Sequence, residues 1–227
     1  MAEGVVWIGS KGGVGTSSSA VLCAAAVAAR GEPVALVDLT GDAAPLLGLD
    51  DARAGLSEVL RGTADLAEVV AQHPSGITVV PRGSEPIDPE FDRDALGDAW
   101  RRLGGDGRAL VADAGSGDDA MDLTEALDAT RVLLTSCCAA ASVRAQDLAD
   151  KADSVAVRTD SRWTATPADL ERFLGRPIDA VVASDPVAAV MGDSSDLARH
   201  GLDTAADLDD LSRLVSLDTP RHRVLSR

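Results

Sequence analysis

Short apolar runs rich in β-branched residues alternate along the chain with longer stretches in which apolar residues recur at helical spacing. Runs that are apolar throughout are typical of strands covered on both faces, and strands separated by helices are typical of parallel sheets. The pattern therefore predicts one doubly wound α/β domain, with a mostly parallel sheet and helices on both of its faces. The predicted strands are Val5–Gly9, Val34–Asp38, Ile77–Pro81, Ala109–Asp113, Arg131–Thr135, Ser154–Val157 and Ala180–Ala183.

One helix carries its own boundary signals. Thr166 offers a hydroxyl that can cap a helix, Pro167 suits the first helical position, and Asp169 places an acid at the third. These residues predict a helix that begins at Pro167 and ends at about Leu174.

Loops do not divide the chain into two domains. A proline-rich run at residues 81–89 and a glycine-rich run at residues 104–107 predict loops, but neither is long enough to act as a linker. We therefore expect one domain over residues 1–217 and a short, flexible tail over residues 218–227.

Composition and charge exclude several classes of protein. With 45% hydrophobic and 26% charged residues the composition is globular, and because aromatic residues make up only 2%, we expect a core of Ala, Val and Leu. The 37 acidic residues exceed the 21 Lys and Arg and give a net charge of −16. This charge opposes sequence-independent binding to DNA or to anionic lipid, because both need clustered Lys and Arg.

The cysteines and the apolar runs indicate a cytoplasmic protein. The chain has three cysteines, Cys23, Cys137 and Cys138, and an odd number with two adjacent disfavours a disulfide framework. Without Cys-x-x-Cys spacing, we interpret the adjacent pair as small thiols beside a strand end and not as a redox or metal pair. The longest apolar run, Ala20–Ala29, is about half of the ~20 residues that cross a bilayer, and the first residues show no basic n-region with a cleavage site, so we expect no secretory leader. We expect any polar or membrane association to be made through partners.

A glycine-rich loop follows the first strand and leads directly into a helix. Glycines allow backbone N–H groups to converge on an anion, and a helix N-terminus adds free donors and partial positive charge. A turn that served only chain geometry would not explain the lysine embedded in it. The sequence therefore predicts phosphate binding by Ser10, Lys11, Gly12, Gly13, Val14, Gly15, Thr16, Ser17 and Ser18.

The loop lacks one residue of a standard P-loop. That motif ends in Gly-Lys-Ser/Thr, so that the lysine reaches the β- and γ-phosphates and the hydroxyl holds Mg²⁺. Here Thr16 occupies the position of the lysine, whereas Ser17 retains the hydroxyl. The positive charge has to come from another residue, and Lys11 is the only cation within the loop.

The Lys-Gly-Gly-Val-Gly core at residues 11–15 resembles the deviant Walker A motif of the ParA/MinD superfamily, and the Thr16 variant resembles its CpaE/TadZ pilus-assembly branch. The resemblance implies a P-loop NTPase that binds ATP or ADP with Mg²⁺ and forms a homodimer. In that dimer Lys11 would be the signature lysine that reaches the partner's nucleotide. Further segments resemble this branch or the wider family in the same order, at residues 34–50, 73–81, 111–117, 142–144 and 182–186.

The resemblance also assigns roles to residues at strand ends. Asp38 would orient an attacking water and act with Lys11 in catalysis, and Asp113 would hold Mg²⁺ together with Ser17. Asp185 and Pro186 would lie against the nucleotide. Each strand-end aspartate could instead cap the turn that follows its strand.

Differences from the family pattern suggest an ATPase that is slow or inactive. Thr40 stands where the family often has a second aspartate. Cys137 and Cys138 replace a proline–acid pair, and no asparagine near Val157 is available to the adenine base.

The implied function is that of a nucleotide-dependent, dimeric localisation protein that positions or recruits a larger machine, by resemblance Tad-type pilus assembly. One alternative is an active ParA/MinD-type ATPase that positions DNA, a division site or a microcompartment. Another is a pseudo-ATPase adaptor with a vestigial site. Thr16 and Thr40 favour the adaptor, whereas the presence of Lys11, Asp38 and Asp113 opposes it.

Overall fold

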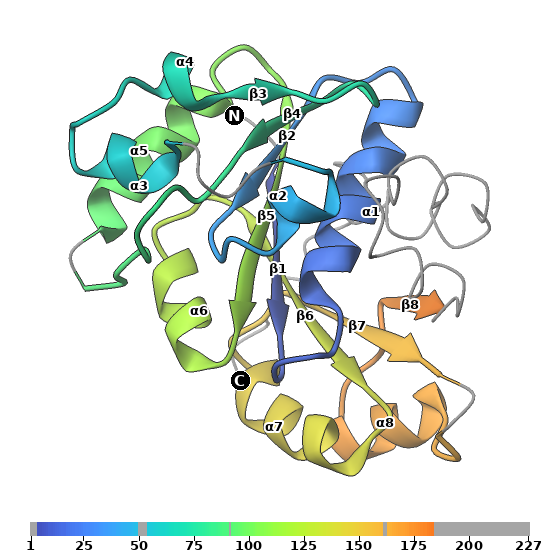
Figure 1. The fold of residues 1–227 in the computed structure, drawn as a ribbon. Helices are drawn as coiled ribbons and strands as arrows, with labels where there is room; N and C mark the ends of the chain where they lie inside the picture. Colours follow the sequence, from blue (N-terminus) through green and yellow to red (C-terminus); the bar gives the residue numbers. More distant parts are fainter. Residues whose placement is uncertain (1–3, 50–53, 91, 161–162, 184–227) are drawn as a thin grey trace.

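The computed structural model describes residues 4–49, 54–90, 92–160 and 163–183 (Figure 1). Strands and helices alternate over most of this part of the chain. In chain order its elements are β1 (Gly4–Gly9), α1 (Thr16–Ala29), β2 (Val34–Asp38), α2 (Ala43–Leu46), α3 (Leu56–Leu60), α4 (Leu66–Val69), β3 (Ala71–Gln72), β4 (Ile77–Val80), α5 (Arg93–Leu103), β5 (Ala109–Ser116), α6 (Asp118–Thr124), β6 (Thr130–Ser136), α7 (Ala139–Ala149), β7 (Ser154–Thr159), α8 (Pro167–Leu174) and β8 (Ala180–Ala183).

All seven predicted strands are present in one sheet, in the order β3-β4-β2-β5-β1-β6-β7-β8. Every neighbouring pair is parallel except β3 with β4, so the predicted mostly parallel, doubly wound sheet is confirmed. The edge strand β3 was not predicted, because two residues are too short to show a period. β5 and β7 continue beyond their predicted ends and carry more residues to the carboxyl edge of the sheet.

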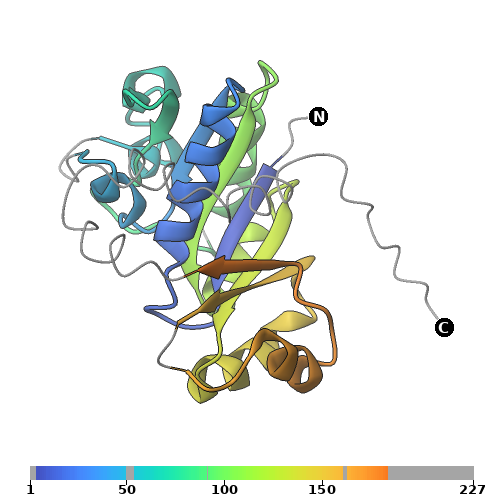
Figure 2. The same cartoon turned by 90° about the vertical axis from the view of Figure 1, so that its right-hand side faces the viewer.

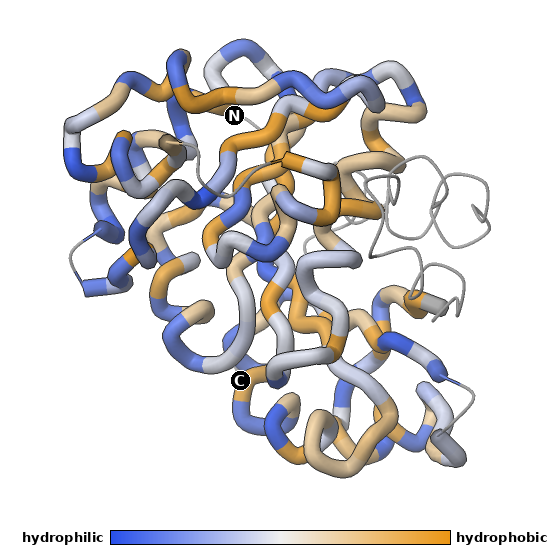
Figure 3. The backbone as a smooth tube through the Cα atoms, viewed as in Figure 1, coloured by the Kyte–Doolittle hydropathy of each residue, from blue (hydrophilic) through white to orange (hydrophobic). Residues whose placement is uncertain are grey.

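Helices cover both faces of the sheet (Figures 1 and 2). Because side chains alternate along a strand, Val5 and Trp7 of β1 join the core beneath α1 and α2, whereas Val6 and Ile8 join the core beneath α3 to α7. Figure 3 shows the hydrophobic positions along the central strands and α1, and the hydrophilic positions mostly in the outer loops. The predicted aliphatic core is confirmed, since most of its buried residues are Ala, Val and Leu.

The segment between β2 and β4 differs from the expected single helical stretch. It forms the short helices α2, α3 and α4, followed by β3. Pro45 lies within α2, and the turns after α2 and α3 reach left-handed backbone at Gly48 and Gly62. These residues interrupt helical hydrogen bonding, so the chain folds into several short turns.

The predicted boundaries of α8 are confirmed. Thr166 accepts a hydrogen bond from the backbone N–H of Asp169 (3.2 Å), and the Asp169 carboxylate accepts one from the backbone N–H of Thr166 (2.8 Å). Pro167 occupies the first turn, and the helix ends at Gly175 in a left-handed conformation. Residues within a single turn therefore define the start of this helix, as predicted.

Within the described ranges, no helix is both long enough and apolar enough to cross a membrane. The predicted tail at residues 218–227 and the candidate nucleotide contacts Asp185 and Pro186 lie outside the described residues.

Candidate functional site

The glycine-rich loop lies at the carboxyl edge of the parallel sheet, between the end of β1 and the start of α1 (Figure 1). Its backbone is anchored to both strands beside β1. The N–H of Ser10 donates to the carbonyl of Leu134 in β6 (2.8 Å), and the N–H of Gly117, directly after β5, donates to the carbonyl of Gly9 (3.0 Å). The Ser10 hydroxyl donates to that of Thr135 (3.1 Å), so this predicted phosphate ligand holds the loop on β6 with its side chain.

The loop has the backbone shape of an anion cradle. Gly13 and Gly15 have φ angles of 80° and 95°, in the left-handed region that favours glycine, and Gly15 is the N-cap residue of α1. A Cβ atom added at Gly12 or Gly13 would meet nothing within 4 Å, so this side of the loop is open. The N–H groups that precede α1 are therefore available to a phosphate.

Thr16 does not extend to the open side of the loop. Its side chain is buried, and its Oγ1 occupies the space that a Cβ atom at Gly9 would need. The hydroxyl therefore packs beneath the loop. Lys11 is half-buried, and its Nζ donates to the carbonyl of Gly12 (2.9 Å).

The structure brings the two predicted Mg²⁺ ligands together. Asp113 is fully buried at the end of β5, where its carboxylate accepts hydrogen bonds from the hydroxyls of Ser17 and Thr40 (2.9 Å for Thr40) and from the N–H of Gly115 (3.2 Å). Burial, together with the charge of Asp38, raises the Asp113 pKa to about 6 against the lowering effect of these hydrogen bonds. A hydroxyl beside a buried carboxylate is a donor set that suits Mg²⁺.

Asp38 occupies the capping role that the sequence left as its alternative. The carboxylate is fully buried, and its two oxygens accept five hydrogen bonds from the loop that follows β2. Oδ1 accepts from the N–H and hydroxyl of Thr40 and from the N–H of Gly41, and Oδ2 accepts from the N–H groups of Ala43 and Ala44 at the start of α2. The predicted catalytic roles of Asp38 and Lys11 stay predictions.

Thr40 joins the two aspartates. Its Oγ1 lies 3.1 Å from Oδ1 of Asp38 and 2.9 Å from Oδ2 of Asp113. The hydroxyl has one hydrogen, so it donates to only one of the two carboxylates at a time, whereas an aspartate at this position would add a third negative charge between them. Thr40 therefore links the loop that follows β2 to Asp113 at the end of β5 and stabilises the loop there. Its neutral hydroxyl does not supply a general base.

Two arginines at this edge were missed by the sequence analysis. Arg82 follows β4, donates from Nη1 to the carbonyl of Thr40 (2.5 Å), and lies against Gly41. Arg158 lies near the end of β7, and its guanidinium lies against Gly15 of the glycine-rich loop. No local motif marks either residue, although Arg158 directly follows a predicted strand end, where side chains reach a ligand crevice.

The two adjacent cysteines lie directly before α7. Cys137 is buried with Val157 and Leu170, and Cys138, which is half-buried, is the N-cap residue of the helix. Both are free thiols. In the described part of the chain, no group of three His, Cys, Asp or Glu side chains is placed to hold a metal ion.

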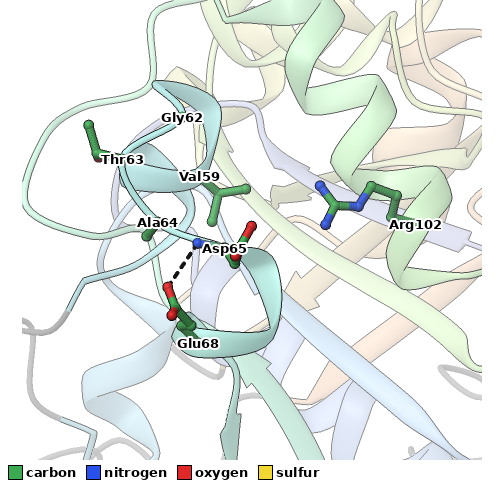
Figure 4. Close-up of a pocket in the computed structure, with 7 residues that line it drawn as sticks. All are labelled: Val59, Gly62, Thr63, Ala64, Asp65, Glu68 and Arg102. Carbon is green, nitrogen blue, oxygen red and sulfur yellow. Dashed lines mark hydrogen bonds between the residues drawn. The ribbon is translucent and has the colours of Figure 1, made fainter.

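A shallow pocket of about 320 Å³ lies elsewhere, among α3, α4 and α5 (Figure 4). Its walls include the start of α4, where the N–H of Asp65 donates to Oε2 of Glu68 (3.0 Å). The pocket contains none of the residues predicted to bind nucleotide. It is lined by Val59, Gly62, Thr63, Ala64, Asp65, Glu68 and Arg102.

The buried Asp113 predicts a specific dependence of stability on pH. Its pKa of about 6 lies above the ordinary value of 3.8, so between these values the folded protein retains a proton that the unfolded chain releases. Stability therefore falls as pH rises through this window. We expect Asp113→Asn to remove a pH-dependent loss of about 1–3 kcal/mol. Urea unfolding at pH 4 and pH 7 without nucleotide would measure it, and equal pH slopes in both proteins would contradict it.

Comparisons with known proteins identify the fold. No family model and no curated sequence matches the chain.

Solved structures match it over almost all of its length. The septum site-determining protein MinD from Pyrococcus horikoshii, complexed with Mg-ADP, is 19% identical over 94% of each chain, with a TM-score of 0.76. Aquifex aeolicus MinD in its complex with MinC is 15% identical over 94% of this chain and 95% of that one, with a TM-score of 0.77. A ParA family ATPase from Chlorobium tepidum is 19% identical over 94% and 96%, with a TM-score of 0.72. This protein therefore has the fold of the MinD and ParA-family ATPases.

Proposed function

We propose that this protein is a nucleotide-dependent, dimeric localisation protein of the ParA/MinD superfamily, which recruits or positions a larger assembly. The observation that carries the proposal is the open cradle before α1 with Ser17 and Asp113 in hydrogen-bond contact beside it. A protein that had lost its nucleotide site would have no need to keep a carboxylate fully buried at this position, because burial of its charge is unfavourable.

The described residues fit ATP or ADP with Mg²⁺. Backbone N–H groups from residues 12–18 would bind the phosphates, and Ser17 with Asp113 would hold the ion. Bound Mg²⁺ would neutralise phosphate charge and favour the ionised form of Asp113. The Mg-ADP named for the P. horikoshii MinD structure supports this choice of ligand.

The same site supports slow hydrolysis or none. Asp38 has both oxygens engaged by the loop that it caps, and Thr40 is neutral. A general base needs a lone pair within reach of the attacking water. We infer that this protein responds to the binding of nucleotide more than to its hydrolysis.

A protein assembly is the partner that best fits the charge of the chain. A net charge of −16 opposes non-specific DNA binding, and the Aquifex MinD structure is a complex with another protein. The loop sequence at residues 11–16 resembles that of the CpaE/TadZ branch, and this resemblance favours a pilus-assembly machine as the partner. The pseudo-ATPase adaptor is the second candidate, because Thr40 and the five hydrogen bonds of Asp38 are compatible with a site that never turns over.

Lys11 provides the test of the nucleotide-dependent dimer. We expect Mg-ATP to convert the native protein from monomer to dimer, and Lys11→Ala to remain monomeric, because the half-buried lysine would then be missing from the partner's phosphates. Sedimentation velocity with and without Mg-ATP would measure the change. Lys151→Ala is the matched control, since Lys151 is the other lysine of the chain and pairs with Asp118 (2.7 Å) on the surface.

The outcomes separate the candidate functions. Absence of ATP binding at millimolar concentration, with the same oligomeric state in every variant, would contradict the nucleotide-dependent dimer and favour the adaptor. Steady ATP turnover by the native protein would favour the active ParA/MinD-type ATPase.

A further inference from the structure

The candidate phosphate loop has no lysine at position 16, where a standard P-loop carries its cation. Thr16 replaces the P-loop lysine and packs its hydroxyl beneath the loop. Lys11 donates to the carbonyl of Gly12 on its own loop. A bound triphosphate would bring three to four negative charges to a protein that already carries −16, so a further cation at the cradle is expected to affect binding strongly.

Arg158 is placed at the cradle by the register of the sheet. It pairs with Ser136 of β6, two residues beyond Leu134, whose carbonyl anchors Ser10 of the loop. Because side chains alternate along a strand, Arg158 shares its face with Ala156, which belongs to the core beneath α1. Arg158 is therefore on the face of the sheet from which α1 rises, at the edge where α1 begins.

The guanidinium of Arg158 packs directly on Gly15. A Cβ atom at Gly15 would overlap Nη1 of Arg158 and would lie 3.0 Å from its Cζ. Gly15 is the N-cap residue of α1, so the guanidinium adjoins the N–H groups that a phosphate would approach. The absence of a side chain at position 15 thus serves two purposes: a left-handed turn with φ of 95° and space for an arginine.

We propose that Arg158 binds the phosphates of the nucleotide from within the same chain, in place of a lysine at position 16. The inference rests on the proposed function, since it requires a nucleotide in the loop. A guanidinium suits this role because it is always charged and binds phosphate oxygens through two parallel N–H donors. Its position on β7 allows it to reach the anion from the side, whereas a lysine would reach it from within the loop.

The test compares binding of Mg-ATP and of Mg-tripolyphosphate, which has no base or sugar, by isothermal titration calorimetry. We expect Arg158→Ala to weaken both ligands about tenfold to a hundredfold, the effect of losing one charge-assisted contact. Arg101→Ala is the matched control, because Arg101 is an exposed arginine of α5 that pairs with Asp98. Thermal unfolding without ligand would show that each variant folds.

Two further variants separate phosphate binding from a structural role. Arg158→Lys keeps the charge, and Thr16→Lys in the Arg158→Ala background returns a cation to the loop, so we expect both to recover affinity. A loss that neither variant restores would overturn the proposal, as would native affinity for both ligands in Arg158→Ala. Weaker Mg-ATP binding with unchanged tripolyphosphate binding would also overturn it, since Arg158 would then contact the base or sugar. A native protein that binds neither ligand would overturn the proposed function together with this inference.

Discussion

Replacing Asp38 by alanine is expected to lower the free energy of unfolding by about 3–5 kcal/mol, the effect of removing one partner from a buried charged network. Four backbone N–H groups around the carboxylate would lose their acceptor, including those of Gly41 and Ala44. Each buried donor left without a partner costs about 1–3 kcal/mol, less where water enters the space. Urea unfolding of the protein without nucleotide would measure the loss.

Asp42→Ala is the matched control for this loss. Asp42 lies in the same loop, its side chain is exposed, and it makes no capping hydrogen bond at the start of α2. We expect a change of about 0.5 kcal/mol or less for this variant. Asp38→Asn should fall between the two, because an amide keeps one accepting oxygen and turns an NH₂ group towards the donors of the other. Equal stability of the Asp38 and Asp42 variants would show that the capping role is wrong.

Thr16→Lys is expected to tighten Mg-ATP binding about tenfold to a hundredfold, since a lysine is long enough to extend past the buried position of the Thr16 hydroxyl and return the charge-assisted phosphate contact of a standard P-loop. The helix N-terminus at this position disfavours a cation in the absence of an anion, so we also expect a slightly less stable protein without ligand. Calorimetric titration with Mg-ATP would measure the affinity, and Thr16→Met would control for side-chain length without charge.

The size of this gain also depends on Arg158. If Arg158 already supplies a cation, Thr16→Lys should improve binding less in the native background than in Arg158→Ala, because two cations that meet one anion are not additive. Unchanged affinity of Thr16→Lys in both backgrounds would mean that position 16 does not face the phosphates. The loop would then differ from a P-loop in geometry as well as in sequence.

Local signals in the sequence were sufficient for much of the fold. The seven strands of the parallel sheet were predicted because buried strands are continuous apolar runs, and α8 because Thr166, Pro167 and Asp169 interact within one turn. The turn from β1 into α1 was predicted for the same reason, as its glycines and the start of the helix are consecutive. The two-residue strand β3 and the short helices between β2 and β4 were missed, because elements of this length show no period.

Contacts between residues that are distant in the sequence determine which groups surround Asp38 and Thr40. Thr40 and Asp113 are 73 positions apart in the sequence, and Arg82 and Thr40 are 42 apart. Asp38 could be predicted as a strand-end aspartate, but its role as a cap depended on how the loop after β2 folds back over it.

The sequence by itself determined the parallel α/β architecture, the glycine-rich loop and the absence of a lysine at position 16, because each depends on residues that are neighbours in the chain. Only the tertiary structure decided which side chains complete the site. In a parallel sheet the carboxyl ends of non-consecutive strands meet at one edge, so Arg158 of β7 reaches Gly15 across β6 from a distant part of the chain. The position of Arg158 beside the glycine-rich loop is therefore a property of strand order and register, and no local motif in the chain specifies it.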